Sequence, residues 1–353
     1  MRCLTNQLAS RERYLHPAAQ KALNSIYARV DQDPSATIII INAMSRSPDG
    51  PINFDQISRT KVVEKLLSHV QNCSLLELCS LFSQLISKAS EQDEKTATMS
   101  KRMAADQLVS VVRSKMIIAS NKGSNSSETD VFINQALSLL AKHAYFVHGQ
   151  HSSASVPTLD TLTIASSREM FQSRIASCLG IVLAKHAEPA QFSYNLIAYI
   201  RSVEEEDNHL HLSFNSDDAV KKVIEKAWLT LTKIHSRSSS AQGSRKRLLS
   251  AFDLLYALTL LQVYDGEAEA VGILDELKNT YDGLLKHKQG SDQGSSDALI
   301  EILLSFASKP SLLHKRLAQE AFSACTSDVS SRGLESMIKV FYPMHECDCQ
   351  DAG

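Results

Sequence analysis

The stretch LLQVYDGEAEAVGIL, residues 260–274, brings together three carboxylates, those of Asp265, Glu267 and Glu269. Carboxylates fixed a few ångströms apart can hold two Mg²⁺ ions about 3.5–4 Å from each other, as metal-dependent nucleotidyl transfer requires. Such carboxylates normally lie on adjacent strands. The cluster therefore raises two alternatives: a metal-dependent enzyme, or a polar turn between two helices.

The sequence on either side favours the turn. Apolar residues recur with helical spacing over 248–263 and again over 270–281,. Gly266 then falls at a helix end, where glycine suits the left-handed conformation. Glu267 and Glu269 fall in the first turn of the following helix, where acids complement the helix dipole. We interpret the stretch as a helix–turn–helix connection and expect no catalytic residues in it.

A basic segment is the second candidate for chemistry. HSRSSSAQGSRKR, residues 235–247, contains Arg237, Arg245, Lys246 and Arg247 and no acid. We expect a flexible, serine-rich loop that contacts nucleic-acid phosphates, serves as a nuclear import signal or is simply solvated. The acidic run EEED, residues 204–207, could instead fold over the cluster and neutralise it. The segment has no aromatic residue for base stacking, so any nucleic-acid contact should be nonspecific and salt-sensitive.

Other motifs are weak. HECDC places His345, Cys347 and Cys349 at alternate positions, one short of the four ligands typical of structural zinc,. His209 and His211 have no further ligands beside them. Phosphate-binding, dinucleotide-binding and nucleophile-elbow glycine motifs are absent from the sequence,. We expect no metal, no cofactor and no small-molecule substrate.

Composition narrows the class of protein. The 353 residues carry a net charge of −2, so nucleic-acid binding would need a local basic patch,. Seven cysteines at irregular spacing do not suggest a disulfide framework, which favours a reducing compartment,. The first residues lack the apolar core of a signal peptide, and no run approaches the ~20 apolar residues of a membrane span. We expect a soluble intracellular protein without a membrane partner.

Helical periodicity recurs from end to end, in about a dozen amphipathic segments. Glycine and proline number only 12 and 8, well below average usage, which disfavours folds with frequent turns. The run TIIII, residues 37–41, fits either a strand or a buried helix. We predict an all-α fold, with antiparallel helix pairs stacked as a HEAT- or armadillo-like solenoid. A compact bundle is the alternative.

The predicted organisation is one helical-repeat region over residues 1–342. A soft break is possible in the acidic segment 203–218, and the basic loop at 235–247 interrupts the pattern a second time. Residues 343–353 form a disordered or atypical tail.

Several long blocks resemble the DNA polymerase V family, also called DNA polymerase phi, the fungal relative of Myb-binding protein 1A. The strongest are GSRKRLLSAFDLLYALTLLQVYDGEAEAVGILDEL and SSDALIEILLSFASKPSLLHKRLAQEAFSACTSDVSSRGLESMI. NFDQISRTKVVEKLL and SREMFQSRIASCL precede them in the family's order. The resemblance runs to about Tyr342, and family members are much longer, so we expect a fragment.

The resemblance implies a DNA-binding nucleolar factor in rRNA gene transcription and ribosome biogenesis. Because residues 260–274 are interpreted as a helix–turn–helix connection and no other active site is assembled, we expect this factor to be non-enzymatic. Its implied partners are pre-ribosomal proteins, rRNA or rDNA, and transcription factors. The alternative is a DNA polymerase similar to B-type enzymes, whose catalytic carboxylates would fall near VYDGEAEA. A generic nuclear scaffold is the third possibility.

Overall fold

The computed structural model describes most of the chain. The described residues are 2–10, 13–46, 54–89, 94–122, 127–148, 159–206, 209–214, 217–286, 293–326, 331, 333–335 and 338. They are helical almost throughout, and their one sheet is a ladder of two short strands. The all-α prediction is confirmed. The solenoid arrangement and the single region over 1–342 stay predictions, and the tail 343–353 lies outside the described residues.

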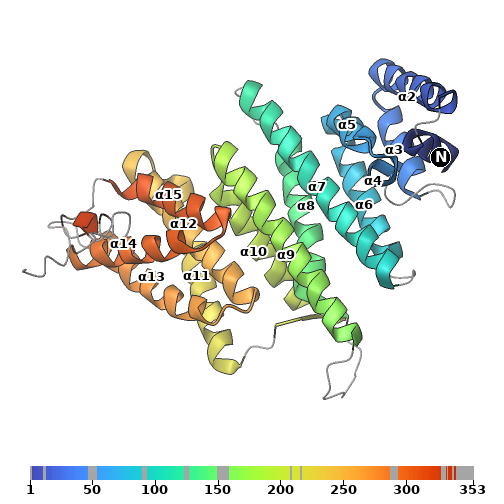
Figure 1. Ribbon diagram of the computed structural model, residues 1–353. Coiled ribbons are helices and arrows are strands. Elements are labelled where there is room, and N and C mark those ends of the chain that lie inside the picture. Colours follow the sequence, from blue (N-terminus) through green and yellow to red (C-terminus); the bar gives the residue numbers. More distant parts are fainter. Residues whose placement is uncertain are drawn as a thin grey trace, which may run out of the picture. The chain divides into compact units, whose positions relative to one another are not determined.

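The chain divides into two compact units (Figure 1). The first comprises Met1–Ala187 and Ala198–Ser213, and the second comprises Glu188–Ile197 and Phe214–Gly353. Helix α10 (Ala190–Glu206) contributes residues to both units.

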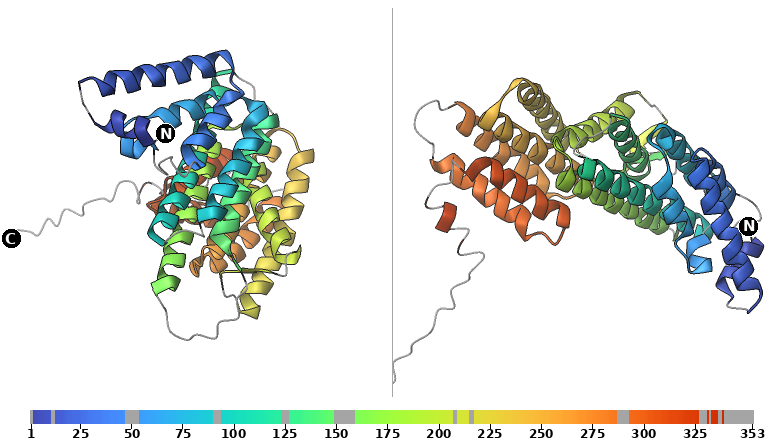
Figure 2. Two further views of the ribbon diagram at one scale, coloured as in Figure 1. Left: turned by 90° about the vertical axis from the view of Figure 1, so that its right-hand side faces the viewer. Right: turned by 90° about the horizontal axis from the view of Figure 1, so that it is seen from above.

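The first unit contains nine further helices, a single 3₁₀ turn and two strands among its described residues. They are α1 (Arg2–Ala9), α2 (Leu15–Gln32), α3 (Ala36–Arg46), α4 (Phe54–Ser58), α5 (Val62–His69), η1 (Asn72–Ser74), α6 (Leu75–Ala89), α7 (Glu94–Lys122), α8 (Ser127–Tyr145), β1 (Phe146–His148), α9 (Leu159–Lys185) and β2 (Leu210–Leu212). Helix α9 packs against both α7 and α8, and the three run side by side in Figures 1 and 2.

Burial explains why TIIII is helical. Thr37, Ile38, Ile41 and Met44 of α3 are buried, whereas Ile39 is 70% exposed. That spacing follows the 3.6-residue helical period and not the alternation of a strand. The ambiguity of the sequence at residues 37–41 is thus resolved in favour of helix.

The small sheet was not predicted. Strand β1 follows α8 directly and pairs antiparallel with β2, in the register Phe146↔Leu212, Val147↔His211 and His148↔Leu210. Strand β2 lies within the acidic segment 203–218, which also contains the last turn of α10. His211 therefore belongs to a strand opposite Val147.

The second unit is organised around one buried helix. Its further helices are α11 (Asp218–Ser240), α12 (Gly243–Tyr264), α13 (Glu269–Lys286), α14 (Gln293–Ser308) and α15 (Leu312–Cys325). Helix α12 packs against α11, α13 and α15, and every residue from Ala251 to Tyr264 is buried. Since a helix enclosed on all sides is apolar on all sides, α12 shows no amphipathic stripe over this stretch.

The sequence led us to expect no membrane-spanning segment. Helix α12 is nevertheless long and apolar enough to cross a membrane, judged by its length and composition alone. It is the one helix among the described residues that meets this condition. Within its most apolar stretch 83% of the residues are buried in the fold. Its place in the core of the second unit accounts for that composition.

Candidate nucleic-acid interface

The four predicted basic residues lie at the junction of α11 and α12. Arg237 is in the last turn of α11, and Arg245, Lys246 and Arg247 are at the start of α12. Only Ala241 and Gln242 separate the two helices, both in extended conformation.

The prediction of a flexible loop over 235–247 is therefore wrong, because all but two of these residues are helical. The serines do not interrupt α11, since their hydroxyls donate to carbonyls one turn earlier: Ser239 to His235 and Ser240 to Ser236. Ser238 is buried against the unit. Gly243 then starts α12 with a φ of 61°, a left-handed conformation that glycine adopts without strain,.

Two of the four cations are held by the protein itself. Lys246 Nζ lies 2.7 Å from Glu188 Oε1, and an Arg237 guanidinium nitrogen donates to the Tyr281 hydroxyl at 3.1 Å. The acid that pairs with Lys246 is thus Glu188, outside the predicted 204–207 run.

The other two cations are available for a ligand. Arg245 and Arg247 are exposed, and within the described part of the chain neither has an ion-pair partner. They lie at a helix N-terminus, where the free N–H groups and the dipole create positive potential. The first turn of α12 has no acid, and its N-cap Gln242 makes no side-chain capping bond. An anion bound here would be stabilised by the free backbone N–H groups and the helix dipole, with either arginine adding positive charge.

A buried polar contact joins the two helices next to this surface. His235 Nδ1 of α11 lies 2.6 Å from Asp253 Oδ2 of α12, and Asp253 is almost fully buried. The ring of Tyr194 stacks on His235 at 3.8 Å and on Trp228 at 5.5 Å between centroids. These residues were missed by sequence reasoning. The one available signal was a lone carboxylate, Asp253, in the otherwise apolar run of α12.

The carboxylate cluster of residues 265–269 is a helix–helix turn, as predicted. Helix α12 ends at Tyr264, Gly266 has a φ of 88°, and α13 begins at Glu269. The Gly266 N–H donates to the Val263 carbonyl at 3.0 Å, and that of Glu267 donates to Gln262 at 2.9 Å. This pair of bonds is the Schellman motif of helix ends.

The fold gives two residues of this turn structural roles. Glu267 pairs with Lys309 at 2.5 Å, and Asp265 is the C-terminal cap residue of α12. Over the described residues, no group of three or more His, Cys, Asp or Glu side chains is arranged to hold a metal. His345, Cys347 and Cys349 lie outside those residues.

The fold and this junction define an all-α protein with an exposed, partly uncompensated basic helix end. The chain belongs to the DNA polymerase phi family, whose sequence profile matches residues 1–351. It is 24% identical to the rDNA transcriptional regulator pol5 of Schizosaccharomyces pombe, over 96% of this chain and 36% of that protein. It is also 24% identical to the rDNA transcriptional regulator POL5 of Saccharomyces cerevisiae, over 96% of this chain and 30% of that protein. The chain thus spans about a third of the length of these relatives. No solved structure gives a significant match.

Proposed function

We propose that this chain acts in the nucleus as a non-enzymatic regulator of rDNA transcription. The observation that carries the proposal is that two relatives aligned over 96% of the chain are both named rDNA transcriptional regulators. A nucleolar location, with a role in ribosome biogenesis as well as rRNA gene transcription, is part of the proposal. Its partners are rDNA or pre-rRNA, transcription factors and pre-ribosomal proteins.

The surface proposed to contact nucleic acid is the α11–α12 junction. Arg245 and Arg247 extend from the first two turns of α12 and supply charge without base-reading side chains. Contacts of this kind position a protein on the phosphate backbone and are insensitive to base sequence. Arg237 contacts Tyr281 and Lys246 pairs with Glu188. A phosphate could compete with Tyr281 and Glu188 for these two cations.

The proposal of a non-enzymatic role is supported by the turn at Gly266. A nucleotidyl-transfer site needs carboxylates that converge on metal ions. Here Glu267 is paired with Lys309, and the backbone of the turn is accounted for by helix-end geometry. The rival activity, DNA polymerisation, would require these carboxylates to rearrange.

The test of nucleic-acid contact is the salt dependence of binding to an rDNA duplex. Each phosphate contact removed should lower the slope of log affinity against log salt by about 0.9. Arg245→Gln with Arg247→Gln should therefore lower it by about 1.8. The matched control is Lys221→Gln with Lys222→Gln, two exposed cations near the start of α11. Equal slopes for both double variants and the parent would refute the assignment of this surface.

A primer-extension assay tests the rival activity. Mg²⁺-dependent extension by the purified chain, abolished in an Asp265→Asn, Glu267→Gln variant, would overturn the non-enzymatic proposal. We expect no extension by either protein.

A further inference from the structure

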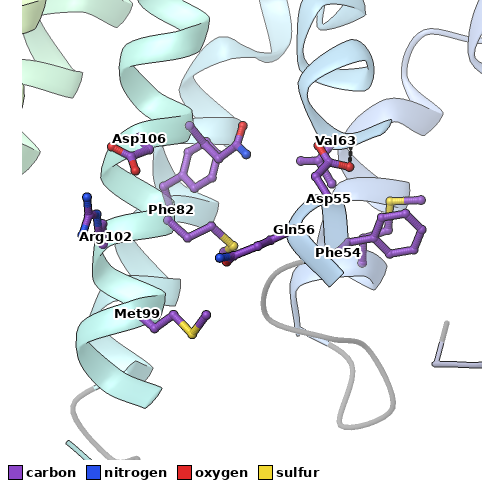
Figure 3. A pocket seen from close by; sticks show the side chains of 11 residues that line it. Phe54, Asp55, Gln56, Val63, Phe82, Met99, Arg102 and Asp106 are labelled. Carbon is purple, nitrogen blue, oxygen red and sulfur yellow. Dashed lines mark hydrogen bonds between the residues drawn. The ribbon is translucent and has the colours of Figure 1, made fainter. Parts of the chain in front are cut away.

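The first unit contains a pocket of about 550 Å³ that the nucleic-acid proposal leaves unused (Figure 3). It lies between α4 and α7, with α3, α5 and α6 contributing to its walls. In Figure 3, Gln56 on α4 and Met99 on α7 face each other from opposite sides. A cavity of this volume is in the range that takes a ligand or a few side chains of a partner.

The apolar part of the lining is rich in methionine. Its members are Met44, Phe54, Val63, Phe82, Met99 and Met103. Met44, Phe54, Val63 and Phe82 are buried, whereas Met99 is 45% exposed. Methionine is unbranched and polarisable, so a methionine-lined surface can repack around different apolar side chains. This part of the pocket suits an aliphatic or aromatic anchor.

The two carboxylates of the lining are already compensated. Asp55 accepts hydrogen bonds from the backbone N–H groups of Val62, Val63 and Glu64, at 2.7–3.1 Å, and so caps the start of α5. Asp106 accepts a hydrogen bond from Arg174 Nε of α9. Neither carboxylate therefore calls for a cationic ligand.

Two other polar groups of the lining remain without a partner among the described residues. Arg102 is exposed at the α7 edge of the pocket and forms no ion pair there. The side-chain oxygen of Gln107, one turn further along α7, is buried and accepts no hydrogen bond. A buried acceptor without a hydrogen bond is unfavourable, so its place in the lining suits a ligand that supplies a donor,.

We propose that this pocket binds a short acidic segment of a partner protein that carries aromatic or leucine side chains. The apolar side chains enter the methionine-lined part, an acidic side chain pairs with Arg102, and a backbone N–H donates to Gln107. A charge-assisted bond to an arginine gives selectivity for carboxylates, and the buried apolar anchor supplies most of the affinity. The pocket is lined by residues of the first unit, whereas the α11–α12 junction belongs to the second unit. The pocket thus offers a protein-binding function in addition to nucleic-acid contact.

The probe is a fluorescein-labelled peptide, EDFEELLEDE, titrated with the full chain and followed by fluorescence anisotropy. Two matched peptides, EDAEEAAEDE and QNFQQLLQNQ, remove the apolar anchors and the acids in turn. Each is expected to bind at least about tenfold more weakly, because each loses one of the two recognised features.

Two variants test the residues. Arg102→Glu reverses the charge at the edge of the pocket, and Met99→Glu places an acid in its apolar part. Both are expected to raise the Kd of EDFEELLEDE at least about tenfold. Lys221→Glu and Leu229→Glu make the same changes at exposed positions of α11 and should leave the Kd unchanged. Circular dichroism and thermal unfolding check that all four variants are folded.

Each outcome decides for or against the pocket. Weakening confined to Arg102→Glu and Met99→Glu supports the proposal. Equal weakening in the α11 variants indicates nonspecific electrostatics and overturns it, as does the absence of saturable binding to EDFEELLEDE. Loss of rDNA affinity in Arg102→Glu, with peptide binding intact, would reassign the pocket edge to nucleic acid. Because the rDNA test uses Arg245 and Arg247, either proposal can fail without the other.

Discussion

His235 and Asp253 form a buried contact between α11 and α12, with Nδ1 and Oδ2 separated by 2.6 Å. Asp253 is only 1% exposed, and Tyr194 stacks against the face of the imidazole. The contact lies two residues from Arg237 in α11 and six from Arg247 in α12. It therefore holds together the two helix ends that carry the basic surface.

The first prediction concerns the pH dependence of this contact. Burial raises the pKa of Asp253, and the hydrogen bond and charge of His235 only partly oppose that effect. A carboxyl with a raised pKa in the folded state keeps its proton while the unfolded chain, with an ordinary pKa of about 3.9, loses it. The contribution of Asp253 to the stability of the parent should therefore fall as pH rises from about 3.9 through the folded-state pKa, and should then stay constant.

Asp253→Asn removes the titration and keeps an acceptor for His235. Urea unfolding of parent and variant from pH 4 to 7 measures the difference between their free energies of unfolding. As pH rises from about 3.9 through the folded-state pKa of Asp253, the stability of the asparagine variant relative to the parent should increase. Above that pKa the difference should level off. A difference that moves in favour of aspartate over this range would show that the ion pair with His235 outweighs burial.

The second prediction concerns the turn between α12 and α13. Gly266 has a φ of 88°, which side chains rarely adopt, although a Cβ there would meet no atom within 4 Å. Gly266→Ala should thus lower the free energy of unfolding by about 1 kcal/mol through backbone strain alone. Gly272, inside α13, has equally open surroundings without the positive φ, so Gly272→Ala should raise stability by up to about 1 kcal/mol,. Chemical denaturation measures the change in the free energy of unfolding for each variant. A change of the same sign in both variants would contradict the prediction.

The features predicted correctly from sequence are those set by local rules. The turn at Gly266 follows from apolar periodicity on both sides and from the preference of glycine for a left-handed helix end. The all-α class follows from the same periodicity over the whole chain. Arg245 and Arg247 were identified from composition, but their setting was misjudged, because serine-rich sequence such as that around Ser239 lacks an apolar stripe. In the helix that this sequence forms, the hydroxyls of Ser239 and Ser240 donate to backbone carbonyls one turn earlier, a contact that apolar periodicity does not report.

The features that sequence did not reveal depend on contacts between distant segments. Strands β1 and β2 have three residues each and pair across more than 60 positions, too short for an alternating pattern,. The pocket combines side chains of five helices between Met44 and Gln107. The hydrogen bonds of Asp55 to the start of α5 exist only once α4 and α5 pack together. The lack of a partner for the Gln107 side-chain oxygen likewise depends on how α7 packs.

The third prediction concerns a buried lysine in the first unit. Lys115 of α7 is 7% exposed, and its ammonium group donates to the carbonyl of Val70, the residue that caps the C-terminus of α5. Cations are favourable at this end of a helix, and a bond from a charged donor contributes about 1.5–3 kcal/mol. Lys115→Met keeps much of the side-chain volume but leaves the carbonyl without this donor. It should lower the free energy of unfolding by about 1–3 kcal/mol.

The control for this change is Lys221→Met, at an exposed position of α11. It should alter stability by no more than about 0.5 kcal/mol, as expected of a surface substitution. Urea unfolding at neutral pH gives both values. If Lys115→Met is as stable as the parent, the cost of desolvating the ammonium group cancels the bond to Val70.

The last prediction concerns thiol reactivity. Burial raises the pKa of Cys79 to about 12, and that of Cys178 to about 12 despite the nearby charges of Arg113 and Arg174. Since the thiolate is the reactive form, only about one in 10⁴ of these thiols would be ionised at pH 8, and burial further limits access. A variant with the other five cysteines changed to serine or alanine isolates the two. Its reaction with Ellman's reagent at pH 8 should be at least about 100-fold slower in the folded state than in guanidinium chloride. Rapid reaction of both thiols with the helical circular dichroism retained would show that α6 and α9 open locally without unfolding of the unit.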